Sequence, residues 1–190
     1  VSHNDDLADL GLAGEMFNLT GTVNNLASPI FDLNSGSATL TGGGNLYNLV
    51  FDTVLDTDNS FLMADLSVIN DVVGPADMLD GFFDISGAGV FSALGFNPID
   101  DLVAGAAQSG LMVGFDTSTQ GPGAFMASIF LDPTSVFAGL TDVNLQVIEL
   151  RISGLIRQAG GSVPVPGTLL LFIGPMLFLL YGVNRRRRFA

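Results

Sequence analysis

Apolar and polar residues alternate with a period of two through most of the first 152 residues. Such alternation is typical of half-buried β-strands, because successive side chains of a strand point to opposite faces. Glycine-rich and Asx-rich stretches, such as 42–44 and 56–59, separate the alternating runs. We therefore predict a mainly β fold, an antiparallel β-sandwich of seven or eight short strands. The predicted strands cover residues 17–23, 37–41, 47–55, 62–68, 83–85, 111–115, 125–131 and 143–152.

The last of these runs changes its apolar parity near Val147. Residues 143, 145 and 147 are apolar at its start, whereas residues 148, 150 and 152 are apolar at its end. A slip of one residue moves every following side chain to the opposite face of a strand. We predict a β-bulge or a bend near Val147, at which the strand passes from one sheet to the other.

A few short helices are also predicted. The segment 98–108 has Asn97 as a potential N-cap, Pro98 at the first helical position, and Asp100 and Asp101 in the first turn. Gly110 follows its end. Shorter helical turns are predicted at 132–139 and after Pro75.

The charges are distributed very unevenly along the chain. All 19 carboxylates precede residue 151, the chain has no lysine, and its six basic side chains are arginines that begin at Arg151. A field of this sign repels nucleic acid and anionic lipid, so neither is expected to bind the domain. Divalent cations or cationic partners suit it better. A second interpretation is that dispersed surface aspartates keep a hydrophobic domain soluble.

Few residues of the chain are suited to catalysis. The chain has no cysteine, and its one histidine, His3, stands beside Asp5 and Asp6, where we expect a solvated terminus. Nucleophile and base pairs are therefore nearly unavailable. Paired carboxylates could hydrolyse glycosides, but the only glutamates are Glu15 and Glu149. We predict that the protein is not an enzyme and has no organic cofactor.

One acidic turn has part of the spacing of a calcium-binding loop. Asp56 and Asp58 occupy the first two ligand positions of an EF-hand, yet Phe61 stands where glycine is required and Ser67 where glutamate is required. The segment is therefore not an EF-hand. Asp56 and Asp58 as oxygen ligands of another type of Ca²⁺ site remain one interpretation, and a plain acidic turn is the other.

The C-terminal tail has the pattern of a membrane anchor. Residues 167–183 carry no charge, and the 21 residues from Val163 to Val183 would span roughly 30 Å as a helix, about the thickness of the bilayer hydrocarbon. Arginines prefer the cytoplasmic side. We predict an extracytoplasmic domain (1–158), a Pro/Gly hinge (159–166), a transmembrane helix (167–184) and a cytoplasmic tail (185–190). The stop-transfer residues are Arg185, Arg186, Arg187 and Arg188.

The first residue is Val1, and no basic and apolar leader precedes Leu7. We therefore expect that a signal peptide has already been removed, and a chain shortened at its N-terminus in another way is the alternative. Together with the arginine block, this leads us to expect the protein in a cell envelope. It would cross the inner membrane once, with its N-terminal domain in the periplasm or outside the cell.

The tail resembles the sorting tail of bacterial PEP-CTERM proteins, which joins a short Pro-x-Pro motif, a transmembrane helix and an arginine cluster. The resemblance covers only the last sixth of the chain, and Val165 stands where the family has glutamate. It implies recognition by an exosortase and association with exopolysaccharide in a Gram-negative envelope. The matching residues are Val163, Pro164, Val165 and Pro166, then 168–171, Gly174 and 185–188.

Two functions are therefore expected as alternatives. The first is an anchored envelope protein that binds or assembles with other envelope components. The second is an uncleaved accessory subunit of a membrane protein complex, for example photosynthetic or respiratory, that stabilises its periplasmic face. Loss of the chain after about Pro166 would favour the first alternative, and an intact arginine block in a purified complex would favour the second.

Overall fold

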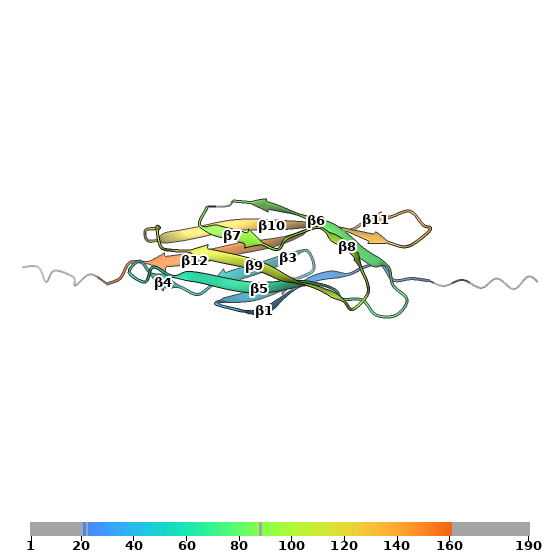
Figure 1. Ribbon diagram of the computed structural model, residues 1–190, viewed down its shortest axis with the longest axis horizontal. Coiled ribbons are helices and arrows are strands. Elements are labelled where there is room, and N and C mark those ends of the chain that lie inside the picture. The colour runs from blue at the N-terminus through green and yellow to red at the C-terminus, as the bar shows by residue number, and fades with distance from the viewer. Residues whose placement is uncertain (1–20, 22, 88, 161–190) are drawn as a thin grey trace, which may run out of the picture.

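The computed structural model describes residues 21–160 except Thr22 and Ala88, and this part of the chain is mainly β with no helix (Figure 1). The predicted β class is confirmed. Among these residues, no helix is long and apolar enough to cross a membrane. The predicted strand 17–23 falls almost wholly outside the described residues, and the hinge from Gly161 on, the transmembrane helix and the arginine tail lie outside them entirely. The strands are β1 (Pro29–Gly36), β2 (Ala38–Gly43), β3 (Leu46–Phe51), β4 (Val54–Leu55), β5 (Phe61–Asn70), β6 (Met78–Ser86), β7 (Phe91–Leu94), β8 (Ile99–Leu102), β9 (Ala107–Asp116), β10 (Gly123–Val136), β11 (Val143–Asn144) and β12 (Ile148–Arg157).

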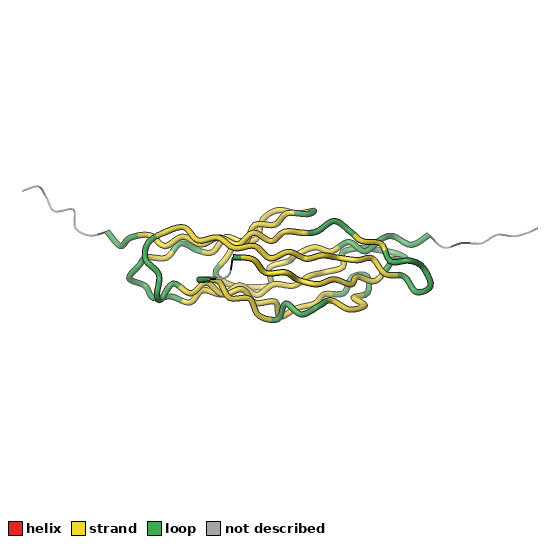
Figure 2. The backbone as a smooth tube through the Cα atoms, turned by 90° about the horizontal axis from the view of Figure 1, so that it is seen from above, coloured by secondary structure: helices red, strands yellow, loops and turns green. Residues whose placement is uncertain are grey.

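The strands form two sheets that pack face to face (Figures 1 and 2). The small sheet has the order β1-β5-β9-β7, and the large one has the order β2-β3-β12-β10-β6-β8, with β11 paired to β10 and β4 paired to β12. The prediction of purely antiparallel sheets is wrong in one place, because β12 runs parallel to β3 and β4. Parallel neighbours need a long connection, and here the chain from β5 to β11 supplies it.

Aromatic rings join the two sheets in the core. Phe51 of the large sheet lies 6.1 Å from Phe91 and 5.7 Å from Phe115 of the small sheet, measured between ring centroids. The Phe115 ring covers Gly154 of β12, where a Cβ atom would overlap it. Each buried side chain of this size stabilises the fold by about 1.5 to 3 kcal/mol. Other fully buried residues are Leu49, Leu66, Leu111, Ile129, Leu131 and Leu150.

The helix predicted at 98–108 is wrong. Ile99–Leu102 is strand β8, which pairs with β6, and β9 begins at Ala107. The N-cap and first-turn signals are local, and burial of Ile99 in the core outweighs them. A tight turn, in which the N–H of Ala106 donates to the carbonyl of Val103 over 3.0 Å, joins the two strands.

The helical turns predicted at 132–139 and after Pro75 are also wrong. Asp132 to Val136 complete β10, and Pro133 lies opposite Gly81 of β6. Proline is tolerated there because only its carbonyl is used, and that carbonyl accepts a 2.9 Å hydrogen bond from the N–H of Leu145. After Pro75 the chain makes a single bridge and then enters β6.

The break predicted near Val147 is confirmed, but the change of sheet is wrong. Residues 145–147 separate β11 from β12, and both strands pair with β10 in the large sheet. A similar break at Asp52 and Thr53 divides the predicted strand 47–55 into β3 and β4. The buried positions are Tyr47, Leu49 and Phe51 before this break and Val54 after it, so the apolar parity changes there too.

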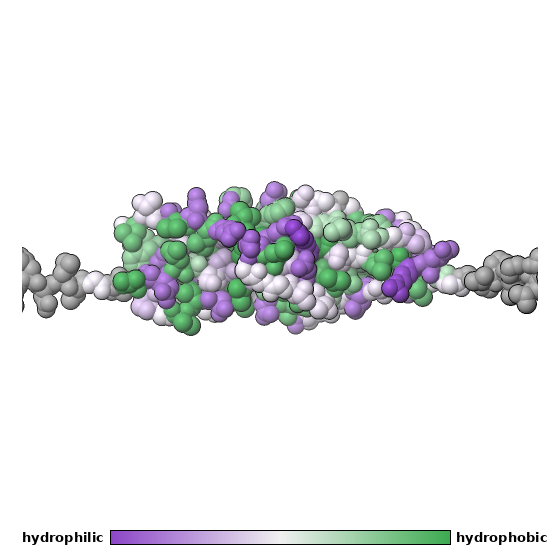
Figure 3. All heavy atoms as spheres, turned by 180° about the vertical axis from the view of Figure 1, so that it is seen from behind, coloured by the Kyte–Doolittle hydropathy of each residue, from purple (hydrophilic) through white to green (hydrophobic). Residues whose placement is uncertain are grey.

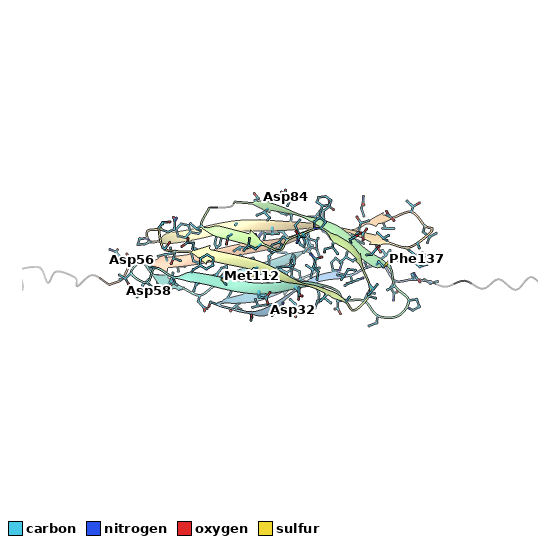
Figure 4. All side chains as sticks on the ribbon, viewed as in Figure 1. Asp32, Asp56, Asp58, Asp84, Met112 and Phe137 are labelled. Atoms are coloured by element: carbon cyan, nitrogen blue, oxygen red, sulfur yellow. The ribbon has the colours of Figure 1, made fainter. Side chains whose placement is uncertain are left out.

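The domain is elongated, and the chain enters and leaves it at opposite ends (Figure 1). The exit end comprises the turn 56–60, the loop 117–122 and residues 157–160. The far end comprises residues 23–28, the loop 71–77 and the loop 137–142. Asp56 and Asp58 lie at the exit end and Phe137 at the far end (Figure 4). The strand β10 connects the two, and its 14 residues span roughly 45 Å.

Candidate functional site

A buried asparagine holds the far end together. Asn70, the last residue of β5, has no exposed surface. Its side-chain oxygen accepts a 2.9 Å hydrogen bond from the N–H of Ser28, and its amide nitrogen donates to the carbonyls of Asp77 (3.1 Å) and Leu102 (3.0 Å). The side-chain amide of asparagine has two N–H donors and one acceptor oxygen, so the donors and the acceptor of Asn70 all have partners. Asn70 therefore joins the N-terminal segment, β6 and β8.

Asp77 extends this network with a buried carboxylate. Asp77 is only 7% exposed. Its Oδ2 accepts a 2.8 Å hydrogen bond from the hydroxyl of Ser135. Its Oδ1 accepts a longer one, 3.3 Å, from the amide of Asn24. The Ser135 oxygen in turn accepts the N–H of Ala27 at 2.9 Å. These bonds fix the carboxylate against the N-terminal segment.

The carboxylate borders a pocket of about 200 Å³ at the far end. The walls are mainly apolar and unusually exposed: Leu140 is 70% exposed and Leu26 is 49% exposed. Figure 3 shows apolar side chains gathered at this end, which lies on the left in that view, and Figure 4 shows Phe137 there. The pocket is lined by Asn24, Leu26, Asp77, Phe137, Leu140, Thr141 and Val143.

Neither arginine of the described part pairs with Asp77. Arg151 bonds Glu149, with 3.0 Å between its Nε and the glutamate Oε1, and this is the one ion pair found between residues 21 and 160. The backbone of Arg157 bonds Asp56 at the exit end. The carboxylate in the pocket thus has hydrogen-bond donors but no cationic neighbour in the described chain.

A second acidic group lies on β6 and β8. Carboxylate oxygens of Asp80, Asp100 and Asp101 lie within 4.8 Å of one another. The N–H of Asp101 donates to Asp80 over 2.7 Å, and Asp101 has a φ of 50°, in the left-handed region. Oxygen donors suit Ca²⁺, but three residues supply fewer ligands than the roughly six to eight it takes. The sequence does not predict this cluster, because the local signals around Asp100 and Asp101 favour a helix.

The predicted calcium ligands are Asp56 and Asp58, and the structure uses both carboxylates to hold the backbone of the exit end. Asp56 accepts a 2.8 Å hydrogen bond from the N–H of Ala159, and Asp58 accepts one of 3.2 Å from the N–H of Leu55. Calcium binding by this pair stays a prediction. The predicted sorting and stop-transfer residues, 163–166 and 185–188, lie outside the described residues, as do His3 and Glu15.

The large sheet carries a shallow depression of about 350 Å³ on its outer surface. Glu149 and Arg151 lie in it, and the hydroxyl of Ser128 donates to Glu149 over 3.0 Å. The hydrogen bond from Arg151 lowers the pKa of Glu149 below its ordinary value, and Glu149 raises the pKa of Arg151. With one carboxylate and one guanidinium already paired, the depression lacks the two free carboxylates of a glycosidase site.

No family model matches this sequence, and no curated protein matches it. Among solved structures, a family 123 glycoside hydrolase from Clostridium perfringens, studied for glycolipid glycan hydrolysis, aligns with a TM-score of 0.35 and 8% sequence identity. The alignment covers 70% of this chain and 27% of the hydrolase. A likeness this low carries no argument about fold or activity.

Proposed function

We propose that this is a non-enzymatic envelope protein that is anchored by its C-terminal tail and binds or assembles with other components through its far end. The observation that carries the proposal is the position of the two ends. The chain leaves the domain at the exit end, and the pocket opens at the far end, roughly 45 Å away along β10. An anchor at the exit end would leave the far end free to meet a partner.

The charge distribution supports the same orientation. All 19 carboxylates precede residue 151, and an acidic domain is repelled by an anionic leaflet. The arginines 185–188 are attracted to such a leaflet, by about 1 kcal/mol each. The resemblance of 163–188 to PEP-CTERM tails supports an exosortase and exopolysaccharide as partners in addition to the bilayer.

Deletion of residues 167–190 tests the anchor. The truncated protein should appear in the periplasm or medium, whereas the full-length protein should sediment with membranes. Replacement of Arg185, Arg186, Arg187 and Arg188 by serine is the control, because the apolar run remains and the protein should stay in the membrane. A truncated protein that resists a high-salt wash of the membranes would overturn the proposal that the tail is the principal anchor.

The mature C-terminus distinguishes sorting from a permanent subunit. Intact mass spectrometry should find a chain that ends near Pro166 if the tail is sorted in the manner of PEP-CTERM proteins. A chain that retains its arginine block inside a purified membrane complex would instead favour the accessory subunit. In that case the far end would pack against the periplasmic face of the complex.

A further inference from the structure

We propose that the far-end pocket binds a lysine or arginine side chain of a partner protein, with the cationic head at Asp77 and the methylene stem between the apolar walls. This inference rests on the proposed function, because it takes the far end to be the binding end. It names the chemistry of the partner that the far end recognises.

The charge of the pocket favours a cationic ligand. Asp77 is 7% exposed, and its two hydrogen-bond partners within the described part of the chain, Ser135 and Asn24, are neutral donors. A buried carboxylate without a cation is costly, and a charge-assisted hydrogen bond to an incoming cation is roughly twice as strong as a neutral one. The 3.3 Å bond from Asn24 to Oδ1 is the longer of the two, and Asn24 itself lines the pocket. Oδ1 is therefore the atom that an incoming cation would contact.

The walls of the pocket suit the methylene stem of a lysine or arginine side chain. Leu26, Phe137, Leu140 and Val143 surround the pocket, and all four are more than two-fifths exposed. Lysine and arginine bury their methylene stems along apolar surface while the charged head finds a polar partner. At about 200 Å³ the pocket is smaller than the roughly 300 to 1,000 Å³ of sites for drug-sized ligands, and it suits a single side chain.

A second copy of this chain is a poor source of that cation. The chain has no lysine, Arg151 is paired with Glu149, and Arg157 lies at the exit end. The remaining arginines, 185–188, are predicted to lie on the cytoplasmic side of the membrane, away from the far end. Copies anchored by their tails in one membrane all direct their far ends away from it, so the exit end of one copy does not meet the far end of another. The cation therefore comes from a different protein.

The test uses the full-length chain in a neutral detergent and four probes observed by NMR. Two are blocked glycine-flanked pentapeptides with a central arginine or lysine. The third carries citrulline, which has nearly the shape of arginine without its charge, and the fourth is free butylammonium. We expect saturable shifts at the methyl groups of Leu140 and Val143 with the arginine and lysine peptides. The citrulline peptide should bind at least about tenfold more weakly, the loss expected for one charge-assisted hydrogen bond.

Two variants that each remove one negative charge distinguish recognition by the pocket from attraction by the overall charge of the acidic domain. Asp77→Asn should remove the preference for arginine over citrulline. Asp142→Asn should keep it, because Asp142 is an exposed residue of the 137–142 loop that does not line the pocket. Leu140→Ser retains Asp77 and should weaken the binding of the arginine and citrulline peptides by the same factor. This third variant keeps the test decisive if Asp77→Asn does not fold.

Several results would overturn the proposal. Equal binding of arginine and citrulline would mean an apolar pocket without charge recognition, and equal losses in the two aspartate variants would mean general electrostatics. If butylammonium binds and neither the arginine nor the lysine peptide does, the pocket is a site for small amines. If no probe binds saturably, there is no site. Because these measurements do not depend on membrane attachment, a failure of the tail as anchor would be detected separately, by sedimentation.

Discussion

The two ends of the domain use aspartate in opposite ways. At the exit end, Asp56 and Asp58 accept backbone N–H groups and close the turn beside the departing chain. At the far end, Asp77 is buried, accepts bonds from side chains, and forms part of an open pocket beside Leu140. One residue type therefore closes the structure at one end and leaves a charged, partly apolar opening at the other.

The difference follows from which groups need partners. At the exit end, the backbone N–H groups of Leu55 and Ala159 donate to the carboxylates of Asp58 and Asp56, and short acidic side chains commonly accept backbone donors in turns. At the far end, Asn70 bonds the backbone groups of Ser28, Asp77 and Leu102, and the carboxylate of Asp77 accepts its bonds from side-chain donors. This difference supports the proposal that the exit end holds the chain and the far end binds a ligand.

The largest effect should come from loss of Asn70. Asn70→Ala would leave the N–H of Ser28 and the carbonyls of Asp77 and Leu102 without partners, at a cost of about 3 to 5 kcal/mol in unfolding free energy. Urea unfolding of the full-length protein measures it. The exposed Asn144→Ala is the control and should change little. Hydrogen exchange should increase first at the far end, and earlier loss of protection at the exit end would refute this assignment.

Removal of the Asp77 side chain should have the next largest effect on stability. Asp77→Ala leaves the hydroxyl of Ser135 and the amide of Asn24 without their acceptor, which should cost about 1 to 3 kcal/mol. The amide protons of residues 24–28 should exchange faster, because this segment is held through the same network. Unchanged exchange in that segment would show that Asp77 does not anchor it.

A smaller effect is expected at the exit end. Asp56→Ala removes one hydrogen bond, to the N–H of Ala159 near the last described residue, and should cost about 1 kcal/mol. The amide of Ala159 should exchange faster while probe binding at the far-end pocket stays the same. A weakened pocket in this variant would mean that the two ends are coupled, and the comparison between them would then break down.

The smallest effect is expected for Glu149, which belongs to neither end. Its pKa is lowered mainly by Arg151, so the pair stabilises the fold above the unfolded value of about 4.3 and ceases to do so as the pH falls through the folded pKa. Because both side chains are partly exposed, the contribution is small. The unfolding free energies of the wild type and of Glu149→Gln should differ slightly at neutral pH and become equal in acid. A gap that widens as the pH falls would contradict this account.

The sequence alone predicts the β class and the phase break near Val147, because both depend on local alternation of side chains. It fails where distant contacts decide the structure. Residues 99–102 carry helix signals, yet burial of Ile99 and pairing with β6 make them a strand. The parallel pairing of β12 with β3 is likewise invisible, since alternation does not encode the direction of a neighbouring strand.

The candidate site was harder to predict than the fold. Asp77 comes from the loop before β6, Asn24 from the N-terminal segment and Leu140 from the loop after β10, so no motif joins them. The acidic spacing in the sequence instead predicts a site at Asp56 and Asp58, which lie at the exit end. A usable signal was present in Leu140, an apolar residue between Gly139 and Thr141 in a segment rich in turn residues.

We propose that the domain is held at its exit end and presents its far end away from the bilayer. Because the chain has no cysteine, a fluorophore can be placed on the exposed Thr119→Cys at the exit end or on the exposed Thr141→Cys at the far end. Each full-length variant is reconstituted in anionic vesicles that contain a lipid with a nitroxide on its headgroup. The predicted hinge 159–166 reaches at most roughly 27 Å when extended. We predict stronger quenching at Thr119→Cys than at Thr141→Cys, and equal or reversed quenching would contradict the account.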